Sequence, residues 1–257
     1  MEAFKIEQQT PLLRLVLGLA DDAMVFSHRL SQWCSHAPYL EEDIALANVA
    51  LDYLGRARLF YQYAGEISGQ EYSEDDFAYL RHERQFTNHL IYELPKGDFA
   101  FTMLRQYFLD EYACLYLPLL IESKDERLSA IASKAIKESR YHLQRSQSWL
   151  QQLALGTEES RRRLLAALDE LKDFIAELFD MPAWEQALLV KGIAVERTKL
   201  QQTWQDQVKS AFSAANLPII TLQSHINGGR SGVHTEHLGH LLCELQYLPR
   251  RYPDMQW

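Results

Sequence analysis

Apolar residues recur every three or four positions along most of this chain, and this spacing is typical of helices. Between residues 40 and 54 one such stripe consists of Leu40, Ile44, Ala47, Leu51 and Leu54. No comparable stretch alternates apolar and polar residues with the period of two that is typical of strands. Gly and Pro are sparse, at 11 and 8 residues, and cluster where helices would end. The pattern therefore predicts an all-α chain.

The positions of the breaks predict long helices followed by shorter ones. We expect long helices over about 11–34, 40–65, 98–121 and 125–156, joined in two pairs by short turns. Ser73 and Asp76 form a capping-box pattern for a shorter helix to about 86, and Thr157 can cap a helix to about 179. Two or three further helices follow. We predict a single all-α domain over 1–257, with a core bundle over about 11–156 and extra helices over about 157–251.

The composition excludes several classes of partner. The chain is 47% apolar and 24% charged, with a net charge of −9, which argues against binding to nucleic acid or an anionic membrane. Its three cysteines are far apart and lack a Cys-x-x-Cys pattern, which is typical of free thiols in a reducing compartment. The apolar run at 12–20 is short and contains Arg14, so we expect neither a signal peptide nor a membrane span. These features predict a soluble cytoplasmic protein.

Two predicted hairpins each place two acids near the middle of the bundle. Residues equidistant from a short turn lie at the same height in an antiparallel pair, so Asp22 should lie level with Asp52 and Asp110 level with Glu138. A di-metal site in a four-helix bundle takes a Glu from each of two helices and a Glu-x-x-His from each of the other two. The four acids therefore have the layout that such a site requires.

The histidines of such a site are missing from the expected positions. Gly55 stands three residues after Asp52, and Tyr141 stands three residues after Glu138. A phenol with a pKa of about 10 is a poor ligand for a divalent ion, and glycine has no side chain to offer. We therefore expect the acids to form an internal polar network in place of a metal centre. The candidate partners are Asn48, Arg56, His142 and Arg145.

Four long stretches and the C-terminal Gln256-Trp257 match a known family. The stretches are LSQWCSHAPYLEEDIALANVALDYLGRARLFYQYAGE at 30–66, RHERQFTN at 81–88, AIKESRYHLQRSQSWL at 135–150 and HTEHLGHLLCELQYL at 234–248. Together they make the chain resemble, over nearly its whole length, the PaaC-type subunits of bacterial phenylacetyl-CoA epoxidases. This resemblance implies a ferritin-like four-helix bundle, with additional C-terminal helices, that lacks a di-iron centre.

The resemblance also implies a division of labour within a larger complex. A paralogous catalytic subunit, PaaA, would hold the di-iron centre and the substrate, alongside a PaaB subunit and a reductase with FAD and an iron–sulfur cluster. The complex would use O2 and NADPH to form a ring 1,2-epoxide on phenylacetyl-CoA. The present chain would be a structural subunit without catalytic residues or a cofactor. Its vestigial metal-site positions would be Asp22, Asp52, Gly55, Asp110, Glu138, Tyr141 and His142.

Two other functions remain open on the residues alone. A self-sufficient metal-dependent oxygenase could use a non-standard ligand set, since a Glu and a His four residues apart on a helix can face the same way. That set would be Asp52, Asp110, Glu138 and His142. A stand-alone helical module could instead bind an acyl-CoA.

A second candidate metal cluster lies near the C-terminus. His237, His240 and Glu244 fall on one stripe of a predicted helix, and two imidazoles with a carboxylate could bind zinc. A plainer interpretation is that Thr235 caps this helix and the histidines are polar groups of the core or of an interface. The preceding loop, 227–232, is glycine-rich but lacks the P-loop pattern, so we expect a flexible connector or partner contact. We expect Trp257 to pack on the body or on a partner subunit.

Overall fold

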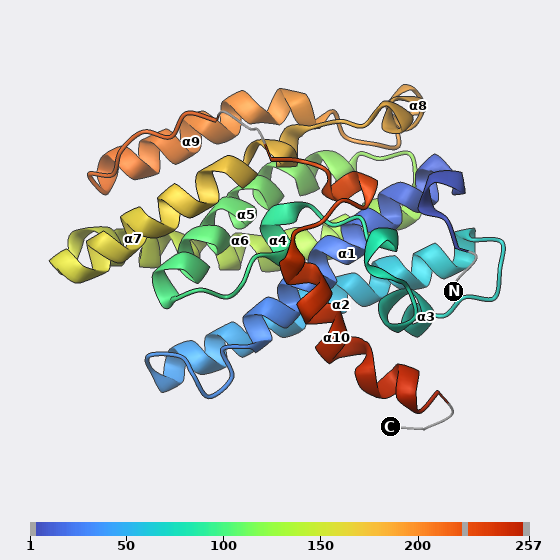
Figure 1. Cartoon of the computed structure of the whole chain (residues 1–257). Helices are drawn as coiled ribbons and strands as arrows, with labels where there is room; N and C mark the ends of the chain where they lie inside the picture. The colour runs from blue at the N-terminus through green and yellow to red at the C-terminus, as the bar shows by residue number, and fades with distance from the viewer. Residues whose placement is uncertain (1–3, 223–225, 254–257) are drawn as a thin grey trace.

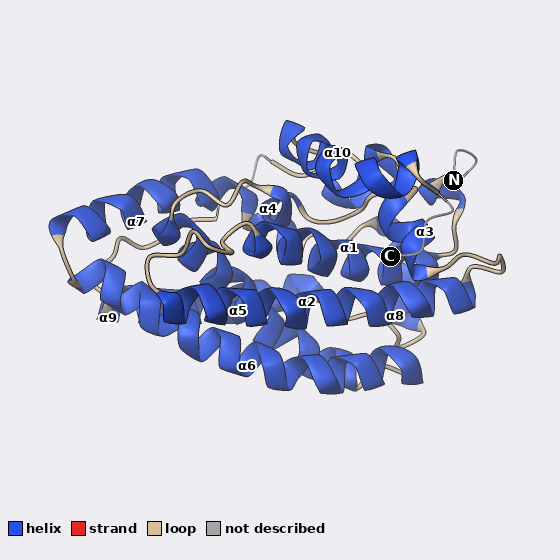
Figure 2. Ribbon diagram, turned by 90° about the horizontal axis from the view of Figure 1, so that it is seen from below, coloured by secondary structure: helices blue, strands red, loops and turns tan. Residues whose placement is uncertain are grey.

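The computed structural model describes residues 4–222 and 226–253, and these residues form helices and loops without a strand (Figure 1). The four long helices are α1 (Pro11–Ser31), α2 (Leu40–Ile67), α5 (Phe99–Ile121) and α6 (Glu126–Leu155). α1 pairs with α2 and α5 pairs with α6, while α2 also packs on α6. Figures 1 and 2 show these helices running alongside one another. The fold is an all-α, ferritin-like four-helix bundle, as the sequence predicted.

Local side chains explain where three of the long helices begin. Thr10 precedes α1 and accepts a hydrogen bond from the N–H of Leu13 at 3.3 Å. Asp98 accepts from Phe101 at 2.9 Å at the start of α5, and Asp125 caps α6 in the same way. Each cap satisfies an N–H group that has no partner inside its helix.

Shorter helices pack on the outside of the four-helix bundle. They are α3 (Glu74–Tyr79), α4 (Leu90–Glu93), α7 (Glu158–Leu171), α8 (Gln186–Val190), α9 (Leu200–Ala214) and α10 (Glu236–Arg251). α7 and α9 pack on α5, whereas α10 contacts α3 and leaves the bundle at a steep angle (Figure 1). Single turns of 3-10 helix occur at Ile6–Gln8, Glu83–Gln85, Lys172–Phe174, Ala176–Phe179, Ala183–Glu185, Arg197–Lys199 and Gly229–Ser231.

Two of the shorter helices end earlier than predicted. The capping box of Ser73 and Asp76 is present, but α3 ends at Tyr79 and not near 86. α7 ends at Leu171 and not near 179, and 3-10 turns follow it. Within those turns the carboxylate of Glu177 accepts hydrogen bonds from backbone N–H groups of distant loops. Such tertiary contacts override a local helical pattern.

The apolar stripe at the start of α2 identifies the helix correctly, but it faces solvent. Leu40 and Leu51 are 73% and 62% exposed. The core-facing stripe of α2 is a second one, consisting of Leu46, Val49, Ala50, Tyr53, Ala57 and Phe60. Both stripes have helical spacing, so periodicity alone does not reveal which of them is buried.

Two further expectations concern the cysteines and possible membrane-spanning helices. Cys34, Cys114 and Cys243 are free thiols, as their spacing predicted. Among the helices that the structure describes, none has the length and apolar character needed to cross a membrane.

Candidate functional site

A cluster of polar side chains fills the middle of the bundle between α2, α5 and α6. We call it the central cluster: Tyr53, Arg56, Asp110, Ser139, His142 and Ser146. All six residues are buried. On α2 the inward-facing pair with a spacing of three is Tyr53 and Arg56, and on α6 it is Ser139 and His142. The bundle interior therefore holds a polar network at the level where the sequence placed the acids.

Asp110 is the buried acid of the central cluster. The hydroxyl of Tyr53 donates a hydrogen bond to Asp110 at 3.3 Å, and that of Ser146 donates at 2.9 Å. Burial raises the pKa of Asp110 to about 7, against the opposing effect of these two hydrogen bonds. The carboxyl group therefore exchanges its proton near neutral pH.

Arg56 places a positive charge in the bundle interior. Its Nη2 donates to the hydroxyl of Ser139 at 2.9 Å and lies 3.8 Å from Oε2 of Glu138. Its guanidinium lies over the ring of Tyr53, with the central carbon 4.7 Å from the ring centre. Because an Arg side chain stays protonated at any ordinary pH, this group repels a metal cation.

His142 connects the central cluster to the surface through Asp52. Nε2 of His142 lies 2.9 Å from Oδ2 of Asp52, whose side chain is 41% exposed, while the imidazole is fully buried. The ring stacks on Tyr53 with 5.7 Å between the ring centres. Burial lowers the pKa of His142, although the hydrogen bond with Asp52 acts in the opposite direction. In the tautomer with a proton on Nε2, the neutral imidazole donates a hydrogen bond to Oδ2 of Asp52.

Gly55 and Tyr141, the two positions expected to replace metal-ligating histidines, do not face the bundle interior. Tyr141 is 61% exposed. Apart from its two chain neighbours and the adjoining backbone of α2, no heavy atom of the described chain would lie within 4 Å of a Cβ atom at position 55. Successive helix residues are separated by about 100°, so the inward positions are Arg56 and His142, one residue further along α2 and α6. The expectation of inward-facing histidine positions at 55 and 141 was wrong by one residue.

Two of the four candidate partners contact a predicted acid, although each contacts the acid of the other helix and not the one on its own helix. Glu138 and Arg56 approach each other, and Asp52 pairs with His142. Arg145 binds Glu42, near the start of α2 and away from Glu138. Asn48 is exposed and lies outside the central cluster.

Asp22 is neutralised by a different part of the chain. Its Oδ2 lies 2.6 Å from Nη2 of Arg230, and its Oδ1 accepts from the backbone N–H of His89 at 2.7 Å. Burial raises the pKa of Asp22, but the positive charge of Arg230 lowers it, and the net result is a decrease. Burial lowers the pKa of His89 to about 4, so this imidazole is neutral. Asp22 thus ties α1 to two distant loops.

The preceding residue, Asp21, has its own set of partners. It forms a fully buried ion pair with Arg81 and accepts hydrogen bonds from the hydroxyl of Tyr61 at 2.6 Å and the N–H of Thr87 at 2.7 Å. We did not predict Asp21, Arg81 or Arg230 as site residues. The available signal was a pair of adjacent acids within the apolar run of 15–26, since buried carboxylates need cationic or hydrogen-bonding partners.

A small cavity of about 40 Å³ separates Asp22 from the central cluster. Its polar lining comes from Asp22, Tyr53, Arg56, Tyr92, Tyr112, Tyr116 and Arg230. This volume is enough for water. The four predicted acids do not converge on one point: Asp22 and Asp110 are buried in separate networks, whereas the side chains of Asp52 and Glu138 are 41% and 22% exposed. Within residues 4–222 and 226–253, no three His, Cys, Asp or Glu side chains are grouped so as to hold a metal ion.

The structure does not bring the C-terminal zinc candidates His237, His240 and Glu244 together as ligands. His240 and Glu244 are exposed, and His237 contributes its backbone carbonyl to Arg29. It is the side chain of the neighbouring His234 that is buried, with Nδ1 2.8 Å from Glu93.

Two further expectations for this region need correction. Thr235 precedes α10 without capping it, because its N–H binds Glu93 at 2.6 Å while its hydroxyl has no partner in the described chain. The 227–232 loop is anchored to the body of the protein. The N–H groups of Gly228 and Gly229 bind Glu177, and Arg230 reaches Asp22. Trp257 lies outside the described residues.

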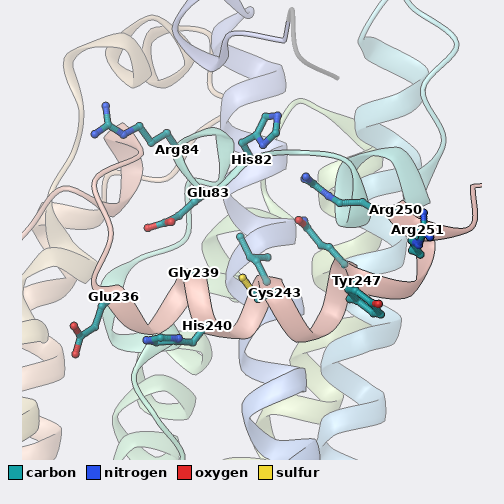
Figure 3. A pocket seen from close by; sticks show the side chains of 12 residues that line it. His82, Glu83, Arg84, Glu236, Gly239, His240, Cys243, Tyr247, Arg250 and Arg251 are labelled. Atoms are coloured by element: carbon teal, nitrogen blue, oxygen red, sulfur yellow. The ribbon is translucent and has the colours of Figure 1, made fainter.

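A surface groove of about 1100 Å³ runs along α10 (Figure 3). His82, Glu83 and Arg84 lie on a segment beside the helix, and all three are exposed. Arg250 at its far end donates to the backbone carbonyls of Tyr79 and Arg81. Among the described residues that line the groove, every acidic and basic side chain is exposed.

Comparison with known proteins places these features in context. The sequence model of a family described as "Phenylacetic acid catabolic protein", PaaA_PaaC, matches residues 2–257. The chain is also 46% identical, over 246 residues, to one component of the 1,2-phenylacetyl-CoA epoxidase of Escherichia coli (strain K12), the subunit designated C. The match covers 96% of this chain and 99% of that relative.

Proposed function

The chain belongs to the family of phenylacetic acid catabolic proteins, and from this premise we propose that it is a structural subunit of a phenylacetyl-CoA ring 1,2-epoxidase. It pairs with a catalytic subunit of the same family, stabilises it and helps to shape its substrate cleft. In this proposal the catalytic PaaA-type subunit holds the di-iron centre. A PaaB-type subunit and a reductase with FAD and an iron–sulfur cluster complete the complex. The end-to-end match to a subunit of the Escherichia coli epoxidase supports this assignment.

The observation that carries the proposal is the position of Arg56. In a di-metal bundle, carboxylates and imidazoles from four helices converge on the interior. Here a guanidinium lies between α2 and α6, next to Ser139 and Glu138. The remaining interior acids are satisfied by their own chain, Asp110 by two hydroxyl groups and Asp22 by Arg230. An interior built in this way supports a structural role better than a catalytic one.

The two alternative functions have different structural and biochemical requirements. A self-sufficient oxygenase would need its ligands to face one another. Here the side chain of Asp52 is 41% exposed and pairs with His142, while Asp110 accepts a hydrogen bond from Ser146. A stand-alone acyl-CoA carrier would be monomeric and would bind acyl-CoA without a second subunit.

The test is co-expression with the catalytic subunit of the same organism, followed by size-exclusion chromatography with light scattering and metal analysis. We expect one heteromeric species in which the iron belongs to the partner. The present chain alone, after anaerobic loading with Fe(II) and desalting, should retain no stoichiometric iron, while the partner retains it. A stoichiometric di-iron centre in this chain together with O2-dependent epoxidation would overturn the proposal. A monomer that binds acyl-CoA by itself would favour the carrier function.

A further inference from the structure

The outward face of α2 carries large apolar side chains that nothing in the described chain covers. Leu40, Ile44 and Leu51 are 73%, 54% and 62% exposed, and Tyr39, which precedes the helix, is 63% exposed. Tyr141 of α6, 61% exposed, stands next to His142, which bonds Asp52. We call these five side chains the α2 face. From residue 40 to residue 55 the helix rises about 22 Å, at 1.5 Å per residue.

The size of the α2 face is that of an interaction surface. Five large side chains that are each more than half exposed present roughly 500 Å² of apolar surface, close to the largest patch of a typical monomer. A stable interface covers about 800 Å² on each partner. The α2 face with its polar surroundings therefore provides the apolar centre that an interface of standard size requires.

Three ion pairs within the chain border the α2 face, whereas Glu41 and Arg140 are exposed beside it without an ion pair in the described chain. Arg145 binds Glu42, His142 binds Asp52, and Arg56 approaches Glu138. A buried charge is costly when its partner is removed, and the centres of interfaces are depleted in charged residues. A partner that covers the three pairs leaves each of these charges with its own counter-charge.

Gly55 is a second, independent sign of close approach by another molecule. Apart from proline, glycine is the least favourable residue in a helix interior. Gly65 on the same helix has a reason within the chain, because a Cβ there would lie 2.6 Å from the carbonyl oxygen of Tyr72. A Cβ at Gly55 would meet no described atom within 4 Å beyond its two chain neighbours and the adjoining backbone of α2. A helix from a partner that packs against α2 at this point explains the glycine.

We propose that the α2 face is the surface that binds the catalytic subunit, through an apolar helix of that subunit laid along α2. This inference rests on the proposed function, since it takes its partner from there. The family designation groups PaaA-type and PaaC-type chains, so the partner is expected to be a bundle with long helices of its own. The apolar area and the space at Gly55 both match an apolar helix.

The test compares the binding of variants to the purified catalytic subunit. Ile44→Asp combined with Leu51→Asp places two charges at the centre of the α2 face. Gly55→Leu places a large side chain beside the helix, at a position where an added Cβ meets no other part of the described chain. The matched control combines Val190→Asp and Ile219→Asp, two apolar residues that are 89% and 63% exposed elsewhere. A fourth variant, Tyr247→Asp, probes the α10 groove. Circular dichroism melting of each isolated variant verifies folding.

We expect the Kd for the catalytic subunit to rise at least about 30-fold for both α2 variants, as for changes at the centre of an interface. The control and Tyr247→Asp should stay within about twofold of the wild type. If the wild type binds and folded α2 variants bind equally well, the inference fails while the proposed function stands. Loss of binding in Tyr247→Asp alone would place the partner on the α10 groove and overturn it.

Two other outcomes also overturn the inference. If the wild-type chain does not bind the catalytic subunit, the proposed function fails as well. If the isolated chain forms a homodimer that both α2 variants abolish, while binding of the catalytic subunit is unaffected, a second copy occupies the α2 face. Sedimentation of the isolated wild type and of the variants separates this case from the others.

Discussion

The hydroxyl group of Tyr53 on α2 donates a hydrogen bond to the carboxyl group of Asp110 on α5, at 3.3 Å across the bundle interior. Both side chains are buried, and Ser146 supplies a second hydrogen bond to the same carboxyl group. An interior carboxylate without a cation at bonding distance is costly. The stability of the protein should therefore depend on the protonation state of Asp110.

The stability of Asp110→Asn, compared with that of the wild type at the same pH, should increase as the pH rises. Burial raises the pKa of Asp110 to about 7, so between about pH 4 and 7 the folded state holds a proton that the unfolded state has lost. The wild type then loses about 1.4 kcal/mol of stability per pH unit from this group, and Asn loses none. Urea unfolding of both proteins at pH 5, 6, 7 and 8 measures the difference, which should grow up to pH 7 and level off. A constant difference would contradict this prediction.

His142→Gln should reveal a pH dependence of the opposite sign. Burial lowers the pKa of His142, so the folded state keeps a neutral imidazole. Below about pH 6.5 the unfolded state binds a proton first, and the wild type loses stability as the pH falls. Gln keeps a donor for Asp52 and does not titrate, so the variant lacks this loss. Thermal melts at pH 7.5 and 5.5 should show a smaller decrease in Tm for the variant, and equal decreases would argue against a buried neutral His142.

The fold was more predictable than these partners because its signals are local. Asp98 and Asp125 cap helices with N–H groups three residues away. Asp21 and Asp22 instead find Arg81 and Arg230 at sequence separations of 60 and 208 residues, which no local pattern reveals.

The orientation of α2 was also beyond a local pattern. Two apolar stripes lie on this helix, and packing against α1 and α6 decides which one is buried. A shift of one residue moves a side chain by about 100° around a helix. For this reason Gly55 was expected in the interior, where Arg56 lies instead.

Arg230→Met should destabilise the protein by about 3–5 kcal/mol, because it leaves the carboxylate of Asp22 buried without its cation. The double change Asp22→Asn with Arg230→Met should cost less than Arg230→Met alone, since it removes the stranded charge. Urea unfolding at pH 7.5 measures the cycle. Arg162→Met, which breaks only a surface pair with Glu159, serves as the control and should have no measurable effect. Independent, additive costs at positions 22 and 230 would show that the pair is not coupled.

Gly55→Ala should raise the stability of the isolated chain, whereas Gly65→Ala should lower it, although both residues lie within α2. Alanine is favoured over glycine in a helix interior by about 1 kcal/mol, and position 55 has open space for a methyl group. For a chain of this size that gain corresponds to an increase in Tm of about 2–4 °C.

At position 65 the same methyl group would lie 2.6 Å from the carbonyl oxygen of Tyr72, so steric repulsion should exceed the gain in helix propensity. Differential scanning calorimetry of the two variants compares them directly under one set of conditions. Destabilisation by Gly55→Ala in the isolated chain would mean that the chain's own fold requires this glycine. Stabilisation there would show that the folded monomer does not need this glycine, as the proposed contact with another molecule requires.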